Sequence, residues 1–281
     1  MFRAARLVLF ARPIVRSALS RNLHGTGRAL GSVTGFIPKA AEEQRVTLQR
    51  FWKKVDIVEN DGILTVTLDK RALRTTEGAK LEIPNSHRLL ATLIAIEWEN
   101  QEKLIKPHAL PMTSIASRAI DGLRDEGARY DLVADLIKYL DTDTICFHES
   151  RPPALVQLQE EHWNPLLEWV QSTYKIKVNI FDSLLGNTQP KETKEVLMNE
   201  VNKLGQWEIA AFERTVLTTK SFIIALALVK GRIGVEQASQ AAQVEVVSQT
   251  QRWGEVEDTH DVDYYDIRRQ LGSVACVLAA N

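Results

Sequence analysis

The sequence lacks the short motifs that mark the most common enzyme active sites. Its 281 residues contain no GxGxxG, GxxxxGKS/T, HExxH, GxSxG or CxxC pattern, which argues against the usual nucleotide-binding enzymes, zinc proteases and serine hydrolases. Only two cysteines, Cys146 and Cys276, are present. They are too few for a disulfide framework and lack metal-ligand spacing, so a reducing compartment is the default. We therefore expect no cofactor and no bound metal.

Long hydrophobic runs are also missing. Beyond the N-terminal segment the longest uninterrupted apolar run is 222–229, FIIALALV, which is far short of the ~20 residues that a membrane helix needs. The sequence has no basic stripe with interleaved aromatic residues of the kind that supports phosphate contacts. These absences predict a protein that neither inserts into a membrane nor binds nucleic acid.

Acidic residues are absent from the first 41 positions, and the first acid is Glu42. The same segment carries seven basic residues, which are Arg3, Arg6, Arg12, Arg16, Arg21, Arg28 and Lys39. An Arg-rich, acid-free start with Ser and small apolar residues is typical of a mitochondrial transit peptide. Residues 21–30 also resemble a two-step matrix processing site. We predict a transit peptide over 1–30 and a linker over 31–47.

The alternative interpretation of this segment is a basic tail that binds acidic partners. Removal of residues 1–30 takes away six arginines and leaves 29 basic against 36 acidic side chains, a net charge of −7. An acidic mature chain is a poor match for nucleic acid, whose phosphates favour basic surfaces. The transit-peptide interpretation places the mature protein in the mitochondrial matrix.

The rest of the sequence has an ordinary globular composition, with 44% hydrophobic and 25% charged residues. Apolar residues alternate over 55–57 and 64–68, and Glu59-Asn-Asp-Gly62 lies between these runs. This pattern predicts a β-hairpin, because Asn and Gly tolerate positive φ. A single hairpin buries too little surface to be stable alone. We expect the next helix, whose apolar stripe contains Leu90, Ile94 and Trp98, to cover it.

Helical periodicity dominates the remaining two thirds of the chain. Helices are predicted over 113–120, 125–140, 155–170, 190–204, 207–217, 222–229, 235–250 and 264–278. In the 235–250 helix the residues expected to face inward are Ala238, Ala241, Ala242 and Val246. The predicted fold is α+β, with a small β-hairpin-containing α/β region over 48–120 followed by a larger all-helical domain over 121–281.

A polar elbow separates the mixed region from the helical one. It contains Asp141, Asp143, Cys146 and His148, and Pro152-Pro153 closes it by breaking helical structure. These residue types suggest a metal site or a Cys–His nucleophile, so one hypothesis is a matrix hydrolase or transferase. The alternative is structural, because Asp and Thr cap helix ends and Cys is commonly a small buried residue.

Six longer segments are more specific than any of these motifs. They are RFWKKVDI at 50–57, IEWENQ at 96–101, LDTDTICF at 140–147, HWNPLLEW at 162–169, GVEQA at 234–238 and QRWGEVEDTHD at 251–261. Together they resemble the family of mitochondrial ATP synthase F(1) assembly factors, the chaperones for the free F(1) α subunit. The resemblance covers most of the chain after about residue 48.

This resemblance implies a two-part fold and a function without catalysis. A member of the family would bind newly imported, unassembled α subunit in the mitochondrial matrix and cover the face that later packs against a β subunit. It would leave as the hexamer closes. The physical reason is that an unpaired subunit of an obligate oligomer exposes an aggregation-prone apolar patch. We expect the free chain to be a monomer and not an enzyme.

Five residues are candidate contacts with the α subunit, namely Glu236, Trp98, Trp253, Asp141 and Asp143. The resemblance places Glu236 at a family position associated with chaperone function. By its position alone it is a favourable carboxylate in the first turn of a helix. Trp98 and Trp253 are candidates because tryptophan is a frequent interface anchor, although core packing is the simpler interpretation of Trp98.

Overall fold

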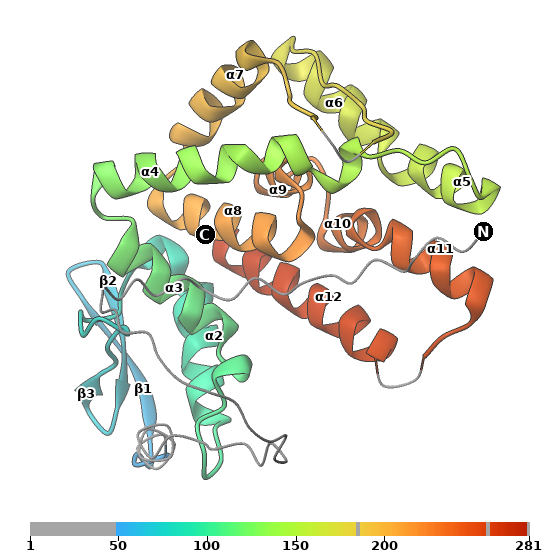
Figure 1. Ribbon diagram of the computed structural model, residues 1–281. Helices are drawn as coiled ribbons and strands as arrows, with labels where there is room; N and C mark the ends of the chain where they lie inside the picture. Colours follow the sequence, from blue (N-terminus) through green and yellow to red (C-terminus); the bar gives the residue numbers. More distant parts are fainter. Residues whose placement is uncertain (1–48, 184–185, 257–258, 280–281) are drawn as a thin grey trace, which may run out of the picture. The chain divides into compact units, whose positions relative to one another are not determined.

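The structure is a computed structural model that describes residues 49–183, 186–256 and 259–279. The predicted transit peptide over 1–30 lies outside the described residues, as does the predicted linker over 31–47. The described chain is mainly helical, with one small antiparallel sheet near its N-terminal end (Figure 1). This arrangement confirms the predicted α+β class.

The bounds of the elements are as follows. The strands are β1 Val55–Asn60, β2 Ile63–Leu68, β3 Arg71–Ala72 and β4 Glu82–Pro84. The α-helices are α2 Arg88–Glu99, α3 Pro111–Gly122, α4 Glu126–Leu136, α5 Pro153–His162, α6 Asn164–Tyr174, α7 Lys191–Asn202, α8 Gln206–Thr219, α9 Phe222–Val229, α10 Val235–Ala242, α11 Val244–Trp253 and α12 Thr259–Leu278. The 3-10 helices are η1 Asn85–His87, η2 Pro107–Ala109, η3 Ile137–Thr142 and η4 Thr144–Cys146.

The sheet is organised around β2. One edge of β2 pairs antiparallel with β1 along its whole length, and the other edge pairs with β3 and β4. Asp61 and Gly62 join β1 to β2 with positive φ angles of 49° and 76°, as the primed two-residue hairpin turns require. The predicted β-hairpin is therefore confirmed.

Helix α2 covers one face of this sheet. Leu64 and Val66 of β2 are fully buried, as are Leu90 and Ile94 on the inner stripe of α2. Helix α2 also packs on α3, and α3 in turn packs on α8 and α12. The sheet is thus tied to the helical part of the molecule through α2 and α3.

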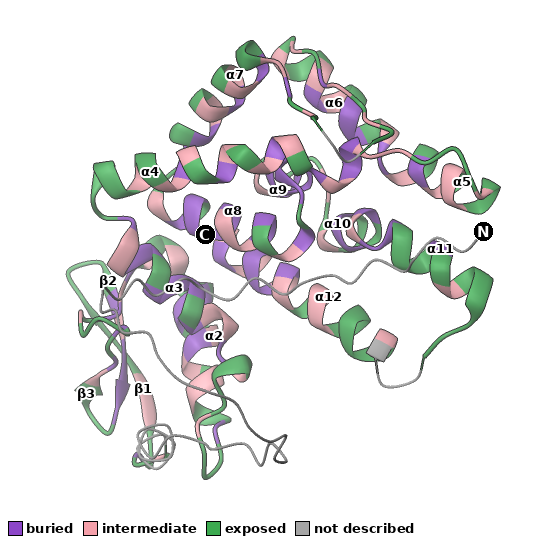
Figure 2. Ribbon diagram, viewed as in Figure 1, coloured by how far each residue is buried: buried purple, intermediate pink, exposed green. Residues whose placement is uncertain are grey.

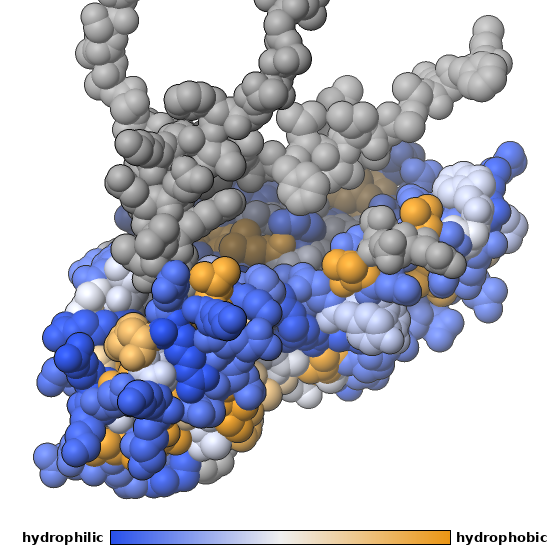
Figure 3. Space-filling model, turned by 90° about the horizontal axis from the view of Figure 1, so that it is seen from below, coloured by the Kyte–Doolittle hydropathy of each residue, from blue (hydrophilic) through white to orange (hydrophobic). Residues whose placement is uncertain are grey.

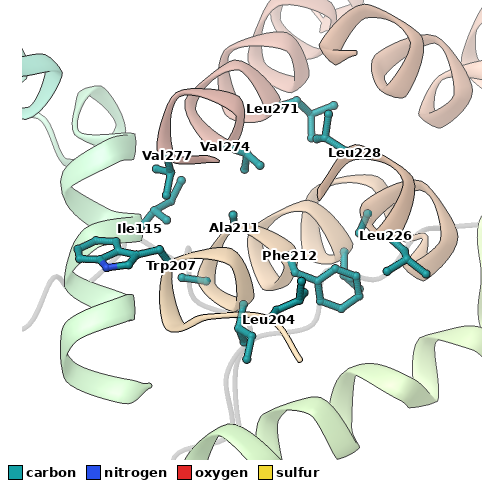
Figure 4. Close-up of a cluster of buried hydrophobic side chains, with 14 of the residues drawn as sticks. Ile115, Leu204, Trp207, Ala211, Phe212, Leu226, Leu228, Leu271, Val274 and Val277 are labelled. Carbon is teal, nitrogen blue, oxygen red and sulfur yellow. The ribbon is translucent and has the colours of Figure 1, made fainter. Parts of the chain in front are cut away.

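Helices α8 and α9 form the centre of the hydrophobic core, and most of their residues are buried (Figure 2). Figure 4 shows side chains of α3, α8, α9 and α12 in one cluster, including Ile115, Trp207, Phe212 and Val277. Among the described residues, the buried hydrophobic side chains other than Leu110 form a single cluster that runs from Trp52 to the last helix. The domain limits set near residue 120 remain a prediction.

The apolar run predicted as a buried helix is α9. Every residue from Phe222 to Leu228 is buried. Among the described residues, no helix combines the length and the apolar character needed to cross a bilayer.

Two of the predicted long helices are each divided in the structure, so those predictions were wrong in extent. The 155–170 helix is α5 and α6, which meet at Trp163. Pro165 lies in the first turn of α6, where its missing N–H costs nothing. The indole Nε1 of Trp163 donates to the Ala241 carbonyl at 2.7 Å, which ties this junction to α10.

The 235–250 helix is α10 and α11, separated at Gln243 with φ −106° and ψ 9°. Neither Gly nor Pro marks this break, so the sequence pattern continues through it. The cause is tertiary, because α10 packs mainly on α9 and α12 whereas α11 packs mainly on α5. Ala238 and Ala241 are buried as predicted, but Val246 is exposed.

The 125–140 prediction was correct for its first part, which is α4, with the Asp125 carboxylate accepting from the Ala128 N–H at its N-terminus. The last part is the 3-10 helix η3, which leads into the polar elbow. The elbow docks on the turn between α8 and α9, where the Thr144 hydroxyl donates to the Lys220 carbonyl at 3.1 Å.

Asp143 links the elbow to the start of α9. Its side chain is fully buried. One carboxylate oxygen accepts from the Ile145 N–H at 3.2 Å, and the other accepts from the Ile223 N–H at 3.0 Å. Burial raises the pKa of Asp143 to about 6, and hydrogen bonds from Ser221 and the backbone oppose that rise. A direct contact between Asp143 and a partner, expected from the sequence, is not possible for a side chain without exposed surface.

The pKa of Asp143 predicts a pH-dependent cost for Asp143→Asn. The folded state binds the proton more tightly than the unfolded chain, whose value is 3.8. The wild-type group therefore stabilises the fold fully below pH 3.8 and loses that contribution as pH rises through 6. Asn cannot titrate, and its NH₂ group faces a backbone donor. We expect Asp143→Asn to be destabilising, with a penalty smaller at pH 7 than at pH 4 by roughly 2 kcal/mol.

Urea unfolding of both proteins at pH 4, 5, 6 and 7 measures this difference. Asp135→Asn is the matched control, because Asp135 is exposed on α4 with 73% of its side chain accessible. A penalty for Asp143→Asn that is constant across the series would contradict the assigned pKa.

Candidate partner-binding surface

The remaining polar groups of the elbow hold neighbouring segments together. Asp141 pairs with Lys194 of α7 at 2.7 Å and accepts from the Gln189 N–H at 2.8 Å. Partial burial of Asp141 acts to raise the pKa of its carboxyl. The hydrogen bonds from Lys194 and Gln189 outweigh that effect, so the pKa is lowered. The half-buried Asp141 thus fixes the segment that leads into α7.

Cys146 and His148 do not form a nucleophilic pair. Cys146 is fully buried, and burial, followed by the charge of Asp143, raises the pKa of its thiol. A thiol in that state is not a nucleophile. The Nε2 atom of His148 lies 3.1 Å from the Ile145 carbonyl, and burial lowers the pKa of its ring. In the parts of the chain that the structure describes, no group of three His, Cys, Asp or Glu side chains could hold a metal.

Glu236 lies in the first turn of α10, where its exposed carboxylate meets α12. Both of its oxygens accept from Arg268, at 2.9 and 2.7 Å. These hydrogen bonds lower the pKa of Glu236. Arg268 also donates to the Gln243 side chain at 3.0 Å and to the Tyr264 carbonyl at 3.1 Å. Its guanidinium lies 3.5 Å from the centroid of the Tyr264 ring.

A run of exposed large hydrophobic residues begins beside this network. Of the seventeen such residues in the described chain, seven lie between Val246 and Tyr265. We name five of them the aromatic edge, and they are Trp253, Val256, Val262, Tyr264 and Tyr265. Trp253 is 71% exposed and Tyr265 is 69% exposed. Clusters of this kind mark protein-binding surfaces more often than isolated exposed residues do.

The aromatic edge joins the end of α11 to the start of α12 (Figure 1). Val256 and His260 exchange two hydrogen bonds across this connection, at 3.0 and 3.2 Å. The rings of Tyr264 and Tyr265 meet edge to face at 5.3 Å. The face of the molecule shown in Figure 3 is mainly hydrophilic, with separate hydrophobic groups.

Trp98 lies elsewhere, on α2. It is half-buried, its ring packs 5.1 Å from that of Trp52, and its Nε1 donates to the Thr113 hydroxyl at 3.1 Å. The preceding Glu97 accepts from the backbone N–H groups of Met112 and Thr113 at the start of α3. Burial raises the pKa of Glu97 against these hydrogen bonds. Trp98 is therefore part of the α2–α3 packing and remains partly exposed.

Trp98 lines a hollow of about 700 Å³ between α3, α8 and the loop after β3, which we name the first hollow. A second hollow of about 480 Å³ lies between α8, α12 and the α10–α11 junction. The two share Arg214 and Leu217 of α8. Gln243, which binds Arg268, lines the second hollow.

The structure thus brings some of the sequence candidates near one surface and separates others from it. Trp98 borders the first hollow, and Glu236 reaches the second through Arg268 and Gln243. Asp141 belongs to the elbow and lines neither hollow.

Arg268 and the two hollows were not predicted. The four-residue spacing of Tyr264 and Arg268 places both on one helix face. No local signal, however, connects them to Glu236, which lies 32 residues from Arg268 in the chain.

Known proteins resemble this chain over most of its length. Residues 49–171 match the family described as ATP12 chaperone protein. The chain is 34% identical over 237 residues to Protein atp12, mitochondrial, of Schizosaccharomyces pombe, and the match covers 82% of this chain and 81% of that protein. It is 33% identical over 270 residues to Protein ATP12, mitochondrial, of Saccharomyces cerevisiae, covering 82% and 83%.

The fold agrees with this relationship. The crystal structure of Atp12 from Paracoccus denitrificans matches with a TM-score of 0.71 and 28% sequence identity, over 83% of this chain and 99% of that chain. The chain belongs to the ATP12 chaperone family.

Proposed function

We propose that this protein is a mitochondrial assembly chaperone of ATP synthase that binds the free α subunit of F(1) in the matrix. It covers the face of the α subunit that later packs against a β subunit, and it leaves when the hexamer closes. Membership of the ATP12 chaperone family carries this proposal. The client follows from the six segments that resemble chaperones for this subunit.

The surface described above suits such a role. A temporary partner must cover an apolar interface and still be displaced by the permanent neighbour, so a few anchors on a polar surface are enough. The aromatic edge offers exposed anchors, and Glu236 and Arg268 lie beside it. We assign the client contact to Glu236, Trp253 and the exposed part of Trp98, with Asp141 holding the fold. The free chain is a monomer in this proposal.

Catalysis has no part in the proposal. The enzyme hypothesis placed a nucleophile or metal at the elbow, but Cys146 is buried with a raised pKa and Asp143 caps α9. These groups support the fold, and neither a cofactor nor a metal is proposed.

The direct test is capture of the client. The purified full chain is mixed with isolated α subunit and, separately, with isolated β subunit, and each mixture is analysed by size exclusion and light scattering. We expect α subunit to stay soluble and to co-elute in a one-to-one complex, and β subunit not to. Capture of β alone, or of neither subunit, contradicts the proposed client.

A charge swap separates two roles of Glu236. Glu236→Lys places two cations together, but an exposed ion pair contributes only about 0–1 kcal/mol, so the fold should survive. We expect α-subunit capture to weaken by roughly tenfold or more, because the surface carboxylate is lost. The double variant Glu236→Arg with Arg268→Glu restores the ion pair and not the carboxylate at position 236. If the double variant captures normally, Glu236 acts only by holding Arg268, and its role as a contact is disproved.

Trp253 provides a second test of the surface. With 71% of the residue exposed, Trp253→Ser should change stability by no more than about 0.5 kcal/mol. As an anchor it should contribute about 2 kcal/mol to binding, roughly a thirtyfold loss of affinity for α subunit. Tyr130→Ser is the matched control, since Tyr130 is 55% exposed on α4. Equal effects of the two variants in titration calorimetry argue against the aromatic edge as the docking surface.

A further inference from the structure

The first hollow has features that the aromatic edge lacks. Its lining includes the buried side chains of Leu110 and Ile115 and the exposed side chain of Leu217 on α8. The ion pair between Arg118 of α3 and Glu213 of α8, at 2.7 and 3.0 Å, braces that lining. Four charged residues in the lining, Arg74, Glu77, Asp121 and Arg214, form no ion pair among the described residues. Two of these, one of each sign, lie on helices α8 and α3.

The first of these groups is Arg214. It donates to the Ser114 hydroxyl at 2.8 Å. Within the described residues it pairs with no carboxylate, whereas the neighbouring Arg118 does. Arg214 lines both hollows, so this residue lies where they meet. An arginine guanidinium that has no carboxylate partner is well suited to bind a carboxylate of another molecule by donating two hydrogen bonds to it.

The second group is Asp121 of α3. Its Oδ2 accepts from the Thr76 hydroxyl at 3.2 Å and from the Glu77 N–H at 3.3 Å. Its Oδ1 is shielded from solvent and accepts no hydrogen bond from the described residues. The residue as a whole is half-buried in the lining and has no cationic partner among the described residues, so its negative charge is available to a basic group of a bound molecule.

We infer that the first hollow is a peptide-binding site for one segment of the client. The segment places an apolar side chain against Leu217, a basic group opposite Asp121, and a carboxylate opposite Arg214. This inference rests on the proposed function and deepens it, because it names the chemistry of the α-subunit segment that the chaperone holds. Charged residues of both signs in the lining favour a segment that carries both charges over a purely apolar ligand.

The size of the site favours a polypeptide over a small molecule. The first hollow alone is within the 300–1,000 Å³ range of small-molecule sites. It continues past Leu217 and Arg214 into the second hollow, whose lining includes Asp263 and Gln243. A chain segment can occupy both hollows and thereby pass from Trp98 towards the Glu236–Arg268 pair.

Charge variants test the inference with the full chain and isolated α subunit. Arg214→Glu reverses the cation, and Asp121→Asn removes the anion while keeping an oxygen for Thr76 and Glu77. We expect each to weaken the affinity for α subunit by roughly tenfold or more in titration calorimetry. Arg151→Glu is the matched control, because Arg151 is exposed and lines neither hollow. Circular dichroism and melting verify that each variant is folded.

A cross-link keeps the test decisive if Arg214→Glu is unstable. Leu217 is 43% exposed, so Leu217→Cys can carry a benzophenone without disturbing the core. Irradiation with α subunit should give one predominant cross-linked peptide, which contains a basic and an acidic residue beside an apolar one. Ile180→Cys, at an exposed position outside both hollows, should give none.

The outcomes separate this inference from the proposed function. Normal capture by the charge variants, with no cross-link from position 217, overturns the hollow as a client site and leaves the proposed function standing. Failure of the wild-type chain to capture α subunit overturns the proposed function and with it this occupant. A small molecule that native mass spectrometry finds bound to the purified chain, and that is lost in Arg214→Glu, overturns the peptide assignment.

Discussion

The fold depends on the enclosure of α9. This helix has no polar face, so it is stable only if other elements cover it on every side. Helices α6, α8, α10 and α12 and the 3-10 helix η3 all contact it. Each large apolar side chain buried here stabilises the fold by about 1.5–3 kcal/mol. The N-terminus of α9 is also buried, and its backbone donors are satisfied by Asp143 and by the Ser221 hydroxyl. The elbow and the helices around α9 therefore belong to one packed core.

The packing around α9 leaves the end of α11 and the start of α12 exposed. Helix α12 packs against α3, α8, α9 and α10, but residues 261–265 in its first turns are exposed. Helix α11 turns away at Gln243 to pack on α5. The end of α11 and the start of α12 consequently carry apolar side chains that the core does not use. An assembly chaperone needs both a stable core and an exposed apolar surface, because it must remain folded while it presents that surface to its client.

The elbow illustrates why residue types alone do not identify chemistry. Two carboxylates, a thiol and an imidazole occur within eight positions, and their spacing is compatible with catalysis. In three dimensions their partners are backbone groups, a lysine and a tryptophan ring. Burial keeps the Cys146 thiol protonated by raising its pKa. The same residue types at a solvent-filled cleft would have different properties, so the environment decides the role.

Local pattern determined much of this protein. Alternation and Asn-Asp-Gly specified the hairpin, and the apolar run 222–229 specified a buried helix, because these features depend on neighbours in the chain. The divisions at Trp163 and Gln243, the pairing of Glu236 with Arg268 and the hollows shared by Arg214 were decided by tertiary structure. Each depends on which helices pack together, because each joins residues that are distant in the sequence and adjacent only in the folded chain.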